Sequence, residues 1–470
     1  MQKTVIKNFS YTFLYQVLSV FIPLITTPYL SRTIGSECIG RYSYFFSVSQ
    51  YFSMFVLLGI NNYGNREIAR ARITNNRQYL SSKFWEIYIM QFVMGVIMCT
   101  CFCIFCKFFS NSDSIFNLFV INIISNMLDI TWFFNGLEMF KVISIRNLII
   151  KFSSAICIFI FIKNSSDFQK YCLIMLCSVL ISQLSLWGIC KKEINFIKIS
   201  LKNVIKHIKP NLVLFLSVLG VSLYKQMDKI MLGNMSDFIE VGYYEQAEKI
   251  INIPLIFITS LGTVMLPRMV TIRVAGERGE FEETFFKSLK IALITSSVII
   301  FGILTVNSEF VPLYYGNGNS IIITLFKILL PSCIFLAVGN VITTQYLIPE
   351  NKDKIYIKSI FIGAGVNLIV NMFCIPKLRC IGAAIGTLVA EISVCIYKIM
   401  KTKCICTSKE VAKNVKYIAW ASIMYILISP LYFYESDILN ILIKLILGIF
   451  YVICSFSIYY LYRKVITNAK

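Results

Sequence analysis

Long apolar runs, separated by short polar segments, recur from one end of the chain to the other. Most runs have the ~17–25 residues that a helix needs to cross the hydrocarbon core of a bilayer. The apolar residues are consecutive and do not alternate with polar ones, which indicates membrane helices and not barrel strands. The pattern predicts fourteen spans, at residues 11–30, 42–60, 84–109, 115–134, 147–162, 171–190, 211–233, 250–267, 289–306, 321–347, 355–375, 381–397, 417–434 and 438–461.

The basic residues are unevenly shared between the two sets of loops that fourteen spans create. Of the 45 Lys and Arg residues, 30 fall in the termini and loops of one side and six in the loops of the other side. Cytoplasmic segments of membrane proteins carry this excess of positive charge. We therefore expect both termini to lie in the cytoplasm. The opening stretch "MQKTVIKNFS" is polar and the first span is too long for a secretory signal, so no cleaved signal is expected.

The composition agrees with a multi-pass membrane protein. The chain is 57% hydrophobic and only 15% charged, whereas a soluble domain is about 25% charged. The net charge of +21 follows from topology and from attraction to anionic lipid of the inner leaflet, so we expect membrane lipids and no nucleic acid as partners. The run "CTCFCIFC" at 99–106 lies in an apolar span without His or carboxylate, so no metal site is predicted. The predicted outer loops contain only Cys38 and Cys380, so no disulfide framework is predicted either.

The segment "KKEINFIKISLKNVIKHIKP" separates spans 6 and 7. Its isoleucines alternate with lysines, which predicts a basic amphipathic helix along the inner membrane surface. We expect His207, the only histidine, to be solvated there. The predicted organisation is an N-lobe of spans 1–6 (1–190), this cytoplasmic linker (191–210), a C-lobe of spans 7–12 (211–400) and an extension of spans 13 and 14 (401–470).

Two loops indicate an internal repeat. Span 1 leads into "LSRTIGSECIGRYSY" and span 7 into "LGNMSDFIEVGYYEQA", about 200 residues later. Each has a polar turn and then a Gly followed closely by Tyr. Both halves would start on the cytoplasmic side, so the repeat would be parallel. Chance similarity of two short loops is the alternative.

The motifs and charges of the sequence distinguish between an enzyme, a channel and a transporter. It contains no H-E-x-x-H, nucleophile elbow or phosphate-cradling glycine loop, and no loop long enough for a catalytic domain, so an enzyme is not expected. A channel or structural protein would not need charges on several spans of a duplicated core. A transporter fits better, because ionisable residues inside a membrane are costly and mark a pathway or a partner.

Span 7 carries three such residues in "LYKQMDKIMLG" (223–233). Lys225 and Lys229 share a helix face, and Asp228 is within reach of Lys225. One interpretation is an internal ion pair with one lysine extending to the outer surface. The other is a cationic strip on a cavity wall, with Asp228 positioning a lysine, that attracts an anionic solute.

Other charges fall at membrane depth in other spans. Asp129 of span 4 and Lys151 of span 5 lie at similar depth, and we expect them to pair. Glu391 of span 12 has no cation within one turn of its own helix, which makes it a candidate ion-coupling carboxylate; a structural acid between lobes is the alternative. We expect Lys444 of span 14 to snorkel to the outer surface.

Several segments taken together resemble one protein family. They are "NNYGNREIAR" (61–70), "LDITWFFNGLEMFKVISIRNLIIK" (128–151), "QMDKIMLGNMSDFIEVGYYEQAEKI" (226–250), "TTQYLIPENKDK" (343–354) and "NLIVNMFCIPKLRCIGAAIGTLVAE" (367–391). The chain resembles the bacterial O-antigen and capsular polysaccharide flippases, in the polysaccharide transporter branch of the multidrug/oligosaccharidyl-lipid/polysaccharide (MOP) exporter superfamily. The likeness runs from span 1 to span 12.

The resemblance implies an all-α, MATE-like membrane fold with two six-helix lobes around a cavity, here followed by two C-terminal helices. It implies a flippase of the bacterial cytoplasmic membrane that moves an oligosaccharide on undecaprenyl pyrophosphate to the outer leaflet, without a cofactor or an ATPase domain. Polysaccharide polymerase and glycosyltransferases would be partners. It places the charged cavity residues at Asp129, Lys151, Lys225, Asp228 and Lys229.

Two alternatives inside the superfamily stay open. A cation-coupled multidrug exporter would favour acidic groups in its spans, whereas lysines outnumber acids in the spans of this chain. A flippase for a lipid-linked peptidoglycan precursor is the other alternative. With no nucleotide site in the sequence, we expect an ion gradient, or polymerisation outside the cell, to drive transport.

Overall fold

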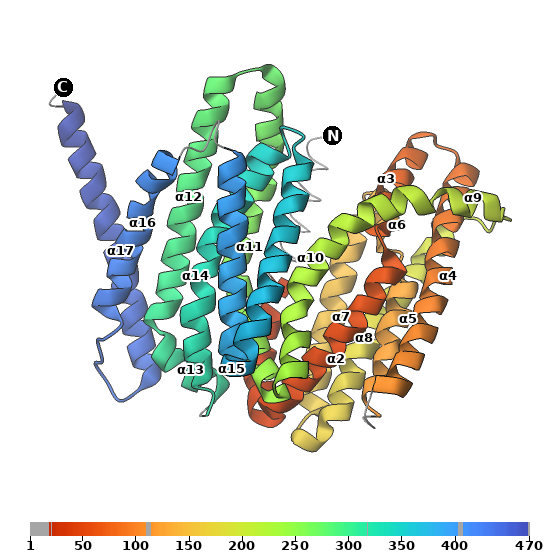
Figure 1. The fold of residues 1–470 in the computed structure, drawn as a ribbon, viewed down its shortest axis with the longest axis horizontal. Helices are drawn as coiled ribbons and strands as arrows, with labels where there is room; N and C mark the ends of the chain where they lie inside the picture. The colour runs from red at the N-terminus through yellow and green to blue at the C-terminus, as the bar shows by residue number, and fades with distance from the viewer. Residues whose placement is uncertain (1–17, 20, 110–113, 317, 403–407, 469–470) are drawn as a thin grey trace. The chain divides into compact units, whose positions relative to one another are not determined.

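The computed structural model describes residues 18–19, 21–109, 114–316, 318–402 and 408–468, and every regular element within these ranges is a helix (Figure 1). Ten helices in this part of the chain are long and apolar enough to cross a membrane. They confirm the predicted all-α membrane class, and the count of fourteen stays a prediction. Residues 11–17 and 20 of predicted span 1 lie outside the described residues, and residues 21–33 are helical.

The chain divides into two compact units, Met1–Glu245 and Gln246–Lys470. The division falls inside one long helix, α11 (Phe238–Ala275). The lobe boundaries expected from the sequence, at 190 and 211, stay a prediction.

In the first unit, α2 is the central helix and packs against α4, α5 and α10. Its core is aromatic, with Phe45, Phe102 and Phe119 buried together. The helices α3, α6 and α9 gather at one end of this unit (Figure 1). The helices are α2 (Gly35–Leu57), α3 (Ile60–Ile73), α4 (Arg77–Phe109), η1 (Phe116–Phe119), α5 (Val120–Met127), α6 (Thr131–Gly136), α7 (Phe140–Phe161), η2 (Ser165–Asp167), α8 (Phe168–Glu193), α9 (Leu201–Lys206) and α10 (Ile208–Met235).

Predicted span 4 (115–134) is not one helix, because the chain breaks between α5 and α6. The side-chain amide of Gln91 donates to the carbonyl oxygens of Asn126 and Asp129, each at 2.8 Å. The indole N–H of Trp187 donates to the carbonyl of Leu128 at 2.9 Å. A backbone carbonyl freed inside a membrane needs such a partner, so these polar side chains make the break possible.

The linker at 191–210 differs from the predicted amphipathic helix. Helix α8 continues to Glu193, residues 194–200 have no regular structure, and α9 is only six residues long. The backbone N–H of Asn195 donates to Ser81 Oγ at 2.9 Å, and its carbonyl accepts from Trp85 Nε1 at 3.0 Å. The linker backbone therefore finds hydrogen-bond partners on α4, and it does not form a helix there.

In the second unit, α12 packs against α14 and α16, and α14 packs against α15. Predicted spans 11 and 12 form the two parts of α15, which are divided by Arg379 (φ 50°, ψ −127°). The chain folds back there. The two parts of α15 then lie so close that a Cβ atom on Gly386 would overlap the side chain of Asn371. The helices after α11 are α12 (Arg278–Thr305), α13 (Asn307–Tyr315), α14 (Ile321–Ile342), the π-helix η3 (Thr343–Leu347), α15 (Asp353–Lys401), α16 (Ser408–Ile428) and α17 (Asp437–Asn468).

The expectation that Lys444 snorkels to the outer surface is wrong. Its side chain is 1% exposed, and its Nζ lies 2.6 Å from Oε1 of Glu309, which is 7% exposed. The same ammonium donates to the carbonyl of Ser429 at 2.8 Å. Because α17 packs against α13, Lys444 faces protein. The carboxylate of Glu309 replaces the water that would otherwise solvate the ammonium.

Candidate functional site

Two glycines bring α2 into backbone contact with the first turns of α11. A Cβ atom on Gly40 would overlap the carbonyl oxygen of Phe238 and would lie 2.7 Å from the amide nitrogen of Gly242. A Cβ atom on Gly242 would overlap the carbonyl oxygen of Ser36. Only glycine allows so close an approach of two backbones. We call this contact, formed by residues 36–47 of α2 and residues 226–245 of α10 and α11, the α2–α11 seam.

Side-chain hydrogen bonds join the two walls of the seam. Each runs from a hydroxyl on α2 to a side-chain oxygen on α10 or α11. They are Ser43 Oγ to Glu245 Oε2 (2.7 Å), Ser47 Oγ to Gln226 Oε1 (2.9 Å) and Tyr44 OH to Asn234 Oδ1 (2.7 Å). Water can replace each of these hydrogen bonds when the walls separate. The bonds therefore stabilise the closed seam but allow it to open.

The seam is formed by corresponding positions of the two similar loops. Gly40 lies in "IGRYSY" and Gly242 in "VGYYEQA". Ser36 and Phe238 are separated by the same 202 positions as the two glycines. Gly40 approaches Phe238 while Gly242 approaches Ser36, so the contact is reciprocal. This reciprocity supports the parallel repeat inferred from the sequence.

Lys229 lies at one edge of the seam in an ion pair with Glu245. Its Nζ is 2.7 Å from Glu245 Oε2, the oxygen that also accepts from Ser43. The two side chains are 12% and 20% exposed. Lys229 is therefore compensated by a carboxylate from the next helix, outside predicted span 7.

Asp228 is buried, and its Oδ2 accepts a hydrogen bond from Tyr244 OH at 2.8 Å. Its backbone belongs to α10, as predicted. The side chain of Lys225, the third residue of this group, lies outside the described part of the structure. The charges at 228 and 229 thus belong to the seam, where α10 meets the start of α11.

The predicted Asp129–Lys151 pair is not found in the described structure. Asp129 Oδ1 accepts the backbone N–H of Thr131 at 2.8 Å, and the cation that acts on this carboxylate is Arg146. The break before α6 directs Asp129 toward the free N–H groups of that helix, which a carboxylate stabilises. Lys151 is half-buried on α7.

His207 is buried, which corrects the expectation that it is solvated. Its Nδ1 lies 2.6 Å from Tyr63 OH, and its Nε2 lies 2.9 Å from Glu86 Oε2. Lys83 Nζ binds the same carboxylate oxygen at 2.7 Å. The start of α10 packs against α3 and α9, and α9 packs against α4, so the histidine is enclosed and fixes the place where α10 begins.

Glu391 is buried in the second part of α15. No cation lies within one turn of it, but Lys398, two turns further on, is also buried and close enough for the two charges to interact. Lys398 Nζ donates to the carbonyl of Gly339 at 3.3 Å. The candidate coupling carboxylate therefore has a neighbouring lysine that the sequence analysis placed beyond the end of span 12.

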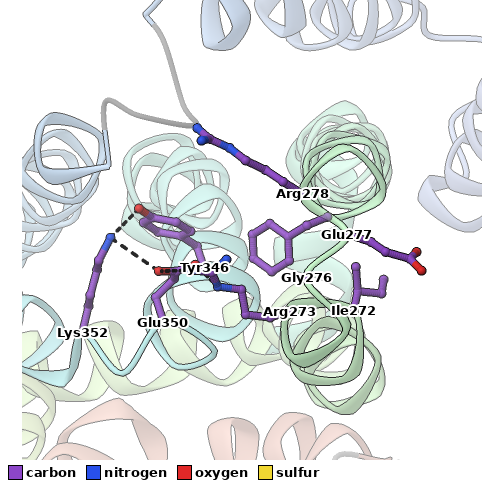
Figure 2. A pocket seen from close by; sticks show the side chains of 9 residues that line it. Ile272, Arg273, Gly276, Glu277, Arg278, Tyr346, Glu350 and Lys352 are labelled. Atoms are coloured by element: carbon purple, nitrogen blue, oxygen red, sulfur yellow. Dashed lines mark hydrogen bonds and ion pairs between the residues drawn. The ribbon is translucent and has the colours of Figure 1, made fainter.

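A polar cavity of about 170 Å³ lies in the second unit, beside the turn after α11 and the segment after α14 (Figure 2). Arg273 Nε pairs with Glu350 Oε1 at 2.5 Å, and Lys352 Nζ donates to Tyr346 OH at 2.6 Å. Figure 2 shows Lys352, Tyr346 and Glu350 together, with Arg278 apart from them. Glu350 lies between two basic neighbours, Arg273 and Lys352, so this group connects the two segments.

Three charged residues with buried or half-buried polar contacts were not expected from the sequence: Glu245, Glu309 and Lys398. Each lies next to the end of a predicted apolar run. Glu245 and Lys398 lie on helices that extend past those ends, and Glu309 lies on α13, which follows α12 directly, so residues assigned to loops are inside the protein. The sequence signal that could have identified these residues is a charge one to five residues beyond an apolar run.

Comparisons with known proteins agree with this architecture. The family model described as "Polysaccharide biosynthesis protein" matches residues 5–273, and that of "Lipid II flippase MurJ" matches residues 170–451. The putative O-antigen transporter of Escherichia coli (strain K12) is 26% identical over 391 residues, which cover 82% of this chain and 93% of that protein.

Solved structures show the same fold. The lipid II flippase MurJ in an inward closed conformation has a TM-score of 0.73 at 16% identity, over 98% of this chain and 100% of that chain. An inward-facing multidrug resistance MATE family transporter of the MOP superfamily has a TM-score of 0.59 at 11% identity, over 85% and 98%. These likenesses confirm the predicted MATE-like fold.

The names of these relatives describe transport and polysaccharide biosynthesis and not an enzymatic reaction, as the sequence predicted. Each of the two family models matches more than half of the 470 residues. The chain therefore belongs to the polysaccharide biosynthesis protein family and to the MurJ flippase family.

Proposed function

We propose that the chain is a flippase that moves an undecaprenyl-pyrophosphate-linked oligosaccharide from the inner to the outer leaflet of the bacterial cytoplasmic membrane by alternating access. The observation that carries this proposal is the α2–α11 seam. Its walls meet through glycines and through side-chain hydrogen bonds that water can replace, beside ring contacts of Phe238 with Tyr44 and Phe45. The names of the relatives support the substrate class.

By the positive-inside argument, the seam closes the outer end of the transport path. With the seam closed, the substrate enters from the cytoplasmic leaflet. When the seam opens, the hydroxyl groups of Ser43, Tyr44 and Ser47 form hydrogen bonds with water instead. The head group of the substrate then leaves toward the outer side. A substrate drives this change only by binding the two states with different affinity.

We propose that the pyrophosphate competes with Glu245 for Lys229, because both are anions and the ammonium is bound at the seam. Lys225, Asp228, Lys151 and Asp129 stay proposed members of the charged cavity. Exchange of one anion for the other would link arrival of the substrate to release of the seam.

The test is flipping by the purified chain in proteoliposomes. A fluorescent lipid-linked oligosaccharide in the inner leaflet should become accessible to an external glycosidase only when the protein is present. A lipid-linked peptidoglycan precursor is the second candidate, favoured by the MurJ match over 170–451. Preferential flipping of that lipid would select the second candidate, and transport of an organic cation instead would support a drug exporter.

We propose that both termini and the linker are cytoplasmic. In a variant whose sixteen cysteines are replaced, Ser320→Cys should react with an impermeant thiol reagent added to intact cells, whereas Asn75→Cys and Lys202→Cys should react only after the membrane is permeabilised. Labelling of Lys202→Cys in intact cells would reverse the orientation.

We propose that an ion gradient drives transport and that Glu391 couples it. Glu391→Gln should remove the stimulation of flipping by an imposed proton or sodium gradient and leave the rate without a gradient unchanged. Glutamine keeps the shape of glutamate but can neither release a proton nor bind a cation as a carboxylate does. Full gradient dependence in this variant would exclude Glu391, and a wild type that ignores both gradients would exclude ion coupling.

We also propose that glycosyltransferases assemble the substrate before it reaches this chain and that a polymerase uses the flipped product outside. Co-purification from crosslinked membranes would detect stable contacts, and its absence would limit the relation to a shared substrate.

A further inference from the structure

A second polar cavity, of about 160 Å³, lies in the first unit between α2, α5 and α10. A single buried water needs only about 10–15 Å³, so the space admits a much larger polar group. The described side chains that line it include no charged group. Its polar lining consists of four amides and three hydroxyls, from Gln50, Asn61, Asn126, Gln226, Tyr51, Ser53 and Ser222.

Much of the hydrogen-bonding capacity of these amides is unused. Within the part of the chain that the structure describes, the side chains of Gln50 and Asn61 form no hydrogen bond. Gln226 uses its oxygen in the seam, and Asn126 uses its nitrogen within α5, at 2.8 Å from the carbonyl of Asn122. Both donors and acceptors therefore remain for a ligand.

The remaining wall is apolar, and includes Met54, Leu57 and Val218. A sugar ring has the matching surface, with hydroxyl groups around its edge and C–H groups on its faces. Neutral amides each offer a donor and an acceptor, as neighbouring hydroxyls or an acetamido group require. A phosphate would need cations or several N–H groups, and an organic cation would need a carboxylate.

We propose that this cavity is a recognition subsite for an uncharged sugar ring of the lipid-linked substrate, with Gln50, Asn61, Asn126 and Gln226 as hydrogen-bonding residues. The inference rests on the proposed function, and it names the part of the substrate that binds at this site. Gln226 also links the subsite to the seam, because its Oε1 accepts from Ser47 while its side chain lines the cavity. A sugar that engages this amide therefore acts directly on a bond that holds the seam closed.

The test compares two lipids, undecaprenyl pyrophosphate carrying a neutral disaccharide and the same lipid without sugar. Gln50 and Asn61 have no protein hydrogen bond to lose, so Gln50→Leu/Asn61→Leu should fold. Each lost hydrogen bond is expected to weaken binding about two- to tenfold. The double variant should therefore bind the sugar-bearing lipid about tenfold or more weakly and the bare lipid as the wild type does, with each single variant in between.

Gln78→Leu, an exposed amide on α4, is the matched control and should bind both lipids normally. Equal binding of the sugar-bearing lipid by the double variant and the wild type would overturn the subsite, as would a wild type that does not distinguish the two lipids. If the wild type distinguishes the lipids but flips neither, the proposed function fails and the subsite stands. Normal binding of the bare lipid shows that the double variant is folded.

Discussion

Replacing Gly242 by leucine is expected to reduce flipping at least about tenfold. Even the Cβ atom would overlap the carbonyl oxygen of Ser36, so α2 and α11 must move apart before the side chain fits. Overpacking of this kind costs about 1–3 kcal/mol where side chains can yield, and a backbone carbonyl cannot yield. Because about 1.4 kcal/mol is a tenfold change in an equilibrium, the closed seam should become a minor state.

Two readouts separate this effect from simple misfolding. Ser47→Cys lies within the seam, and in the Gly242→Leu background it should react faster with an impermeant thiol reagent, because the seam stays open. Gly188→Leu is the matched control: no atom outside its own helix lies within 4 Å of a Cβ atom there. Normal flipping by Gly242→Leu would mean that closure of the seam is not part of transport.

Replacing Lys444 by alanine is expected to lower the free energy of unfolding by about 3–5 kcal/mol. The loss is large because Glu309, 7% exposed, would keep its charge without the ammonium 2.6 Å away. The carbonyl of Ser429 would lose its donor as well. Thermal unfolding of the purified protein in detergent, followed by abundance in the membrane, measures the effect.

The second arm of this experiment removes both charges. Lys444→Met/Glu309→Gln should recover most of the lost stability, because no uncompensated ion remains and methionine fills the apolar surroundings. Lys327→Ala, at an exposed lysine of α14, is the control and should change stability little. A double variant as unstable as Lys444→Ala would show that the packing of the lysine stem matters and that the ion pair does not.

The fold was predictable because its main signal is simple. Apolar runs fix where helices lie, and the Gly-Tyr similarity between the two loops indicated the repeat that the reciprocal contact of Gly40 and Gly242 supports. The break at Asp129 was not predictable. It depends on Gln91 and Trp187, which come from other helices and satisfy the freed carbonyls only in three dimensions.

The partners of the charged residues were predicted poorly for a different reason. In a membrane, lipid and protein are both apolar, so helical periodicity does not tell which face of a span meets protein. Lys444 was therefore expected at the surface although it lies buried beside Glu309. His207 was assigned to water because its neighbours in sequence are basic, whereas its neighbours in space are Tyr63 and Glu86.

The reciprocity of the seam also concerns the ancestry of the chain. When position 40 of one copy approaches position 36 of the other, and the reverse holds as well, the contact is isologous, as in a two-fold symmetric homodimer. A small ancestral membrane protein with a glycine at this position could have paired with itself through the same surface before gene fusion joined the two copies. On such an origin, Ser43 opposite Glu245 would mark a place where the two copies differ, since a hydroxyl and a carboxylate occupy the two equivalent positions.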